Sequence, residues 1–65
     1  MRFPKIGDVV ESTTLPGDPG TVTKILEYNT KGPSIVEVKW FIWVAPDGGR
    51  SSEEFAWDLK IVSEA

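Results

Sequence analysis

Histidine and cysteine are both absent from the 65 residues of this sequence. Histidine is the commonest general base in enzymes, cysteine is the usual thiol nucleophile, and together they supply most transition-metal ligands. We therefore expect no catalytic activity, no metal site and no cofactor. Without cysteine no disulfide can form, and small domains of that kind belong mainly in a reducing compartment. The expected location is the cytoplasm.

Long apolar runs are lacking as well. No stretch approaches the roughly 18 residues that a membrane-spanning helix needs, and residues 1–5 are not followed by the apolar stretch of a signal peptide. We expect a soluble protein with no membrane partner. An excess of positive charge is also missing, because seven basic residues stand against ten acidic ones and give a net charge of −3. The long-range field repels phosphate, which disfavours general nucleic-acid binding.

The residues that are present suffice for a folded domain. Hydrophobic residues make up 40% of the chain and charged residues 26%, which is ordinary for a globular protein and far from the composition of disordered chains. A chain of this length has room for one small core. The sequence predicts a single domain over residues 1–65.

Proline and glycine fall between short apolar runs, and this spacing of turn-forming residues predicts a compact β meander. The expected strands cover residues 9–12, 21–28, 35–44, 50–55 and 60–63, with a hairpin turn at 45–49 and a brief helical turn at 58–59. The main rival is a full helix over 52–60, since Ser51 or Ser52 could cap it and Glu53 and Glu54 suit a first turn.

The run 35–44 has the strongest alternation, with one face that is entirely apolar. That face is expected to be core, so Phe41 and Trp43 would lie on the outer face of the same strand. Because Val22 and Ile25 are three residues apart, both can be buried only if a bulge interrupts their strand. The expected core consists of Val9, Val22, Ile25, Val36, Val38, Trp40, Ile42, Leu59 and Val62.

Several of these runs resemble known small barrels. GDVV at 7–10 followed by PGTVTKI at 19–25 resembles the KOW pattern, and VEVKW at 36–40, DG at 47–48 and DLKIV at 58–62 are similar to the later strands of Tudor-like barrels. The resemblance covers roughly residues 5 to 63. It implies an all-β fold, a single SH3-like five-stranded small barrel with a short helical turn before the last strand. Such barrels serve many unrelated tasks.

Large apolar residues on an outer face usually mark an interface. Aromatic rings flanked by acids suit a cationic ligand, and the Tudor resemblance implies cation–π binding of methylated lysine or arginine. An equally weighted interpretation is that Phe41 and Trp43 cover the open end of the barrel or an oligomer seam. The leading hypothesis is a small accessory or regulatory protein that binds a basic protein partner. Its candidate binding residues are Phe41, Trp43, Trp57, Tyr28, Glu53, Glu54 and Asp58.

Two alternatives remain open. A nucleic-acid-binding barrel would stack bases on Phe41 or Trp43 and would contact phosphates through Lys24, Lys39, Arg50 and Lys60. A homo-oligomer would bury the same aromatics in its own interface and could enclose a small-molecule site. The pair Glu53 and Glu54 is not expected to be catalytic, because adjacent residues of a strand point to opposite faces.

Overall fold

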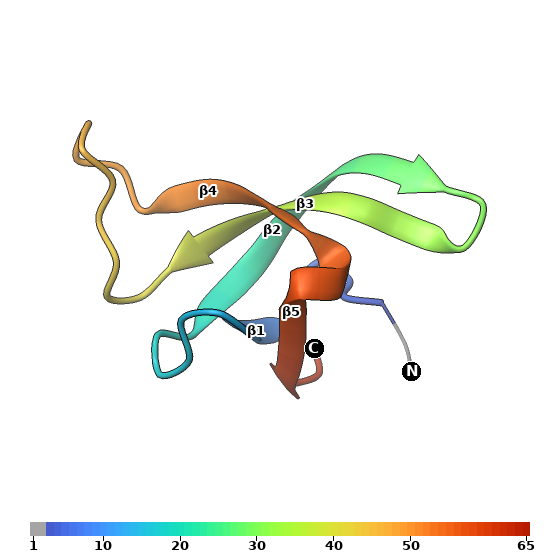
Figure 1. Ribbon diagram of the computed structural model, residues 1–65, viewed down its shortest axis with the longest axis horizontal. Coiled ribbons are helices and arrows are strands. Elements are labelled where there is room, and N and C mark those ends of the chain that lie inside the picture. Colours follow the sequence, from blue (N-terminus) through green and yellow to red (C-terminus); the bar gives the residue numbers. More distant parts are fainter. Residues whose placement is uncertain (1–2) are drawn as a thin grey trace.

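Five antiparallel strands form one sheet in the computed structural model, which describes residues 3–65 (Figure 1). The elements in chain order are β1 (Val9–Ser12), β2 (Gly20–Asn29), β3 (Gly32–Trp40), β4 (Ser51–Phe55), the 3-10 turn η1 (Ala56–Asp58) and β5 (Leu59–Ser63). The expected all-β class and its five strands are thus confirmed. Residues 1 and 2 of the expected domain lie outside the described residues.

The strands lie side by side in the order β4-β3-β2-β1-β5. Within residues 3–65 no ladder joins β4 to β5, so the sheet has two edges and its hydrogen bonding does not close into a barrel. The turn η1 connects the two edge strands directly along the chain (Figure 1). Within residues 3–65 the edge of β4 away from β3 is therefore unpaired.

The core is made by one face of the sheet. Its buried apolar side chains are Val10, Val22, Val36, Val38, Trp40 and Leu59, with Ile25 and Ile61 packed against them. Every residue of this buried set except Val10 was expected in the core. Five core predictions are thus confirmed, namely Val22, Val36, Val38, Trp40 and Leu59. The predicted bulge in β2 is also confirmed, because Val22 pairs with Val38 and Lys24 with Glu37, which leaves Thr23 as the extra residue.

Two core predictions are wrong by one position. Val10 is buried in place of Val9, and Val62 is 52% exposed while Ile61 packs against the core. From Ser12 opposite Leu59 to Val10 opposite Ile61 the ladder is regular, which puts Val10 and Ile61 on the same face as Leu59, and a bulge follows only between Ile61 and Ser63. A shift of one residue moves side chains to the other face of a strand.

The third strand ends earlier than predicted, at Trp40 instead of residue 44. The amide of Phe41 donates to the carbonyl of Pro19, and the next two amides donate to the carboxylate of Asp18. These contacts lead the chain away from β4. Ile42, expected in the core, is consequently 68% exposed. Phe41 and Trp43 lie in the connection 41–50, not on the outer face of a strand.

The fourth strand is present, and the rival helix over 52–60 does not form. Ser52 pairs with Val38 and Glu54 with Val36, so the ladder with β3 takes the residues that would have begun a helix. The helical turn lies at 56–58, two residues before its expected start. The predicted turn at 45–49 is confirmed by the 2.7 Å hydrogen bond from the amide of Ala45 to the carbonyl of Gly49.

Candidate functional site

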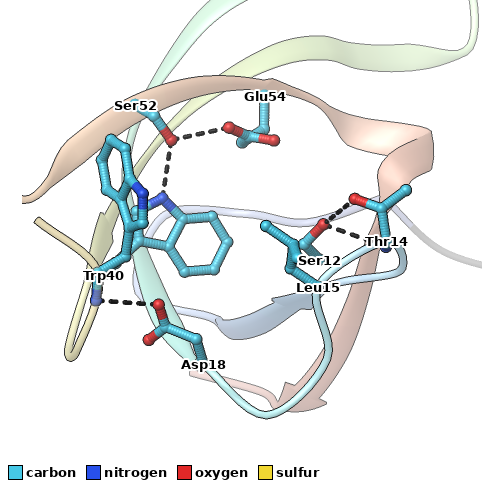
Figure 2. A pocket seen from close by; sticks show the side chains of 8 residues that line it. Ser12, Thr14, Leu15, Asp18, Trp40, Ser52 and Glu54 are labelled. Atoms are coloured by element: carbon cyan, nitrogen blue, oxygen red, sulfur yellow. Dashed lines mark hydrogen bonds between the residues drawn. The ribbon is translucent and has the colours of Figure 1, made fainter. Parts of the chain in front are cut away.

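A pocket of about 210 Å³ opens beside β4, between that strand and the connections 13–19 and 41–50. Figure 2 shows two indole side chains at one side, Ser12, Thr14 and Leu15 at the other, and the carboxylates of Glu54 and Asp18 above and below. The residues that line it are Ser12, Thr14, Leu15, Asp18, Trp40, Trp43, Ser52 and Glu54. Three segments of the sequence, residues 12–18, 40–43 and 52–54, thus meet around one hollow.

A chain of hydrogen bonds holds the pocket's β4 side. The indole Nε1–H of Trp40 donates to Oγ of Ser52 at 2.7 Å, and that hydroxyl donates to Oε2 of Glu54 at 2.7 Å (Figure 2). Indole nitrogen can only donate, so the one hydroxyl proton of Ser52 must go to the carboxylate. The two hydrogen bonds therefore both run from Trp40 toward Glu54, and the second one holds a carboxylate oxygen of Glu54 in place.

Asp18 holds the opposite side. Its two carboxylate oxygens accept the backbone N–H groups of Ile42 at 3.1 Å and Trp43 at 2.9 Å. Hydrogen bonds to an ionised acceptor are stronger than neutral ones. Asp18 therefore fixes the start of the connection 41–50 and with it the position of Trp43, which is 38% exposed at the pocket.

The third wall comes from the connection after β1. The hydroxyls of Ser12 and Thr14 lie 2.9 Å apart, and the amide of Thr14 donates to the same Ser12 oxygen at 3.2 Å (Figure 2). Ser12 is buried, whereas Leu15 is 69% exposed at the rim. This wall adds hydroxyl groups and one apolar side chain but no charge.

Electrostatics and size together indicate what the pocket accepts. Its lining holds two carboxylates, two indole rings and no basic side chain. Ring faces attract cations, most strongly when the ring is tryptophan. The volume, about 210 Å³, falls below the roughly 300–1,000 Å³ of typical small-molecule sites. The arrangement suits a single cationic side chain.

Of the residues predicted to bind a partner, only Trp43 and Glu54 meet in this pocket. Phe41 lines a separate hollow with Thr21, Lys39, Trp40 and Arg50. Glu53 points away from Glu54 because it precedes it on the same strand. Tyr28 is 66% exposed on the β2–β3 hairpin, which projects away from the connection 41–50 in Figure 1.

The turn η1 carries the other two predicted residues away from the pocket. Trp57 stacks on Phe55 with ring centroids 4.8 Å apart and lines a groove of about 640 Å³ along β5. The backbone carbonyl of Asp58 accepts the amide of Thr13 at 2.9 Å. The predicted aromatic surface is therefore divided among four places.

The four predicted nucleic-acid contacts are also divided. Lys39 and Arg50 flank Phe41, and the guanidinium of Arg50 donates to the carbonyl of Phe41 at 2.8 Å. Lys24 pairs in register with Glu37, and Lys60 lies along the groove beside Trp57. Lys39 and Arg50 share a surface with Phe41 and Lys60 shares one with Trp57, so the four basic residues do not gather around one ring.

Sequence reasoning missed several residues that build the pocket. Asp18 carries no prediction, Trp40 is expected only in the core, and Ser52 is expected only in the fourth strand or as a helix cap. One signal was available, because Ser52 and Glu54 are two apart in a strand and must share a face. The contact of Asp18 with the amides of Ile42 and Trp43 spans more than twenty residues and has no local signal.

Residues 3–65 hold no group of three or more acidic side chains placed to bind a metal ion. No helix in the same part of the chain is both long and apolar enough to cross a membrane. Comparisons with protein-family models, with curated proteins and with solved structures return no match. The function is therefore inferred from the geometry of the pocket.

Proposed function

We propose that this chain is a non-catalytic module that binds a protein partner by taking one cationic side chain of that partner into the pocket beside β4. The observation that carries the proposal is the meeting of two indoles with two carboxylates in a hollow of about 210 Å³. A cation there would gain attraction from ring faces and from both acids. The partner is basic, and the module serves an accessory or regulatory role.

We also propose that the fold belongs among the SH3-like small barrels. The strand order β4-β3-β2-β1-β5 and the 3-10 turn between β4 and β5 support this. The KOW-like and Tudor-like runs in the sequence support it independently. At this level of likeness the fold assigns no ligand, so the binding proposal depends on the pocket alone.

Nα-acetyl-lysine methylamide is a direct probe of the pocket, with the uncharged norleucine amide as its control. We expect the lysine probe to shift the indole resonances of Trp40 and Trp43, and the norleucine probe to leave them unchanged. Glu54→Gln should weaken the lysine probe about tenfold, by loss of a charge-assisted contact. Equal response to both probes would contradict the proposal.

Trp43→Ala tests the aromatic wall. Because Trp43 lies outside the strands and is 38% exposed, the variant should stay folded while probe binding falls several-fold. Trp57→Ala is the matched control, since that ring is 54% exposed and lines a different groove. If Trp43→Ala unfolds the chain, Trp43 is a structural residue and the proposed binding role of the pocket is wrong.

The hollow at Phe41 favours a second candidate, binding of single-stranded nucleic acid. There Lys39 and Arg50 stand beside a ring that is 55% exposed, a combination that suits a base stacked between phosphate contacts. Titration with a ten-nucleotide oligothymidine at low and moderate salt tests it. Binding that vanishes in Phe41→Ala and falls steeply with salt is expected, and no binding at low salt removes this candidate.

A further inference from the structure

Along β4, the backbone N–H and C=O groups of alternate residues point away from β3. The amide of Trp40 donates to the carbonyl of Arg50 at 2.7 Å, and the register that places Lys39 opposite Ser51 continues to this pair. In an antiparallel ladder, hydrogen-bonded pairs alternate with non-hydrogen-bonded pairs. Every second residue after Arg50 therefore bonds to β3. The residues whose N–H and C=O groups point outward are Ser51, Glu53 and Phe55.

Nothing in the described part of the chain covers that edge. The strand β4 pairs only with β3, and no backbone or side-chain hydrogen bond reaches its outward amides within residues 3–65. The side chain of Glu53 is exposed. A free edge of this kind is a template for another strand, and extended peptides add to sheet edges by main-chain hydrogen bonds.

Both faces of β4 carry a carboxylate, and within residues 3–65 Lys24, which lies opposite Glu37 in the β2–β3 ladder, forms no ion pair with it. Glu53 lies directly opposite Glu37, and like charges in that position repel. No ion pair joins either of them to a basic side chain among residues 3–65. On the other face Glu54 borders the pocket. An extended segment laid along the edge would meet one carboxylate on each face.

We propose that β4 accepts an extended basic segment of a protein partner as an added strand. Successive side chains of a strand point to opposite faces. Two consecutive basic residues of the segment would therefore meet Glu54 in the pocket and Glu53 outside it. This inference rests on the proposed function of the pocket and adds the partner's conformation and its pair of basic residues.

A second copy of this chain is the other occupant to consider. Antiparallel pairing of β4 with its own copy, centred on Glu53, would set that carboxylate opposite itself. The Glu37–Glu53 pair would add two more like charges. Charge therefore favours a basic segment over self-association.

The probe is a ten-residue peptide of threonine and valine with a central Lys-Lys pair. It should bind at least about tenfold tighter than the lysine amide and should protect the amides of Ser51, Glu53 and Phe55 from hydrogen exchange. The same peptide with backbone N-methyl groups along one edge keeps its side chains but loses strand hydrogen bonds. It should bind about tenfold more weakly, as expected for the loss of one or two such bonds.

Two variants at position 53 separate the contribution of the strand's outward N–H group to peptide binding from that of the carboxylate. Glu53→Thr removes the carboxylate but keeps the outward N–H, whereas Glu53→Pro removes both and leaves the ladder with β3 intact. We expect several-fold weaker peptide binding in the first and about a further tenfold in the second. Because Glu53 is outside the pocket, neither variant should change binding of the lysine amide.

The outcomes distinguish the two proposals. If the lysine amide binds but N-methylation and Glu53→Pro leave the peptide affinity unchanged, edge docking is wrong and the pocket function stands. If the lysine amide does not bind while the peptide protects the β4 amides, the pocket function is wrong. If the protein alone dimerises and protects those amides, the occupant of the edge is a second copy and the basic-segment proposal is wrong.

Discussion

At the scale of single residues, short polar side chains hold the pocket in place. Ser52 accepts from Trp40 and donates to Glu54, while Asp18 accepts two amides of the connection 41–50. The Ser52 hydroxyl and the Asp18 carboxylate lie on opposite sides of the same pocket. Each can be removed by one substitution that changes no apolar core residue.

Ser52→Ala should lower the free energy of unfolding by about 1–3 kcal/mol, because it leaves the indole N–H of the buried Trp40 without its acceptor. Urea denaturation measures the loss, and the Nε1–H resonance of Trp40 should shift upfield. Ser51→Ala is the matched control, since that side chain is exposed on the other face of β4. Equal stability of the two variants would contradict the hydrogen-bond chain.

Asp18→Ala should release the connection 41–50 and cost about 1–2 kcal/mol, since two charge-assisted hydrogen bonds are lost. Hydrogen exchange at the amides of Ile42 and Trp43 should become faster, and the lysine probe should bind several-fold more weakly. Asp47→Ala serves as control because that carboxylate holds only the local amide of Gly49. Unchanged exchange at Ile42 and Trp43 would remove Asp18 from its role.

At the scale of the elements, the sequence predicts strands well and their ends less well. The first strand, the bulge in β2 and the turn at 45–49 all follow from local spacing and turn residues. The end of β3 does not. The apolar alternation continues past Trp40 to residue 44, but the carboxylate of Asp18 binds the backbone there. A contact so distant in the sequence outweighs the local pattern.

Strand β3 packs closely against Gly20, the first residue of β2. A Cβ atom at this position would lie 2.6 Å from Cγ1 of Val38, 2.8 Å from Cε3 of Trp40 and 2.9 Å from the carbonyl of Lys39. Gly20→Ala should therefore cost about 3 kcal/mol in urea denaturation, as overpacking of a tight core does. In Gly17→Ala the new Cβ meets nothing within 4 Å, and only the strain of a positive φ, about 1 kcal/mol, is expected.

At the scale of the whole molecule, the two ends of the described chain are held together by a side chain. Asp8 is fully buried, and its carboxylate accepts the amide of Lys5 and the amide of Ala65, each at 2.9 Å. The ammonium of Lys5 adds an ion pair at 3.3 Å. Sequence reasoning placed Asp8 only in a KOW-like run, because a contact between positions 8 and 65 leaves no local pattern.

Asp8→Ala should destabilise the entire sheet, because it empties a fully buried position and leaves the amides of Lys5 and Ala65 without their acceptor. We expect a loss of about 3 kcal/mol, measured by urea denaturation with tryptophan fluorescence and with circular dichroism. The two probes should give one shared midpoint if the fold unfolds as a unit. Should this variant fail to fold, Asp8→Asn, which keeps one oxygen acceptor, should retain a folded state with a smaller loss. If instead only the amides near residues 5 and 65 exchange faster while the midpoint is unchanged, Asp8 fastens the ends alone and the sheet is stable without it.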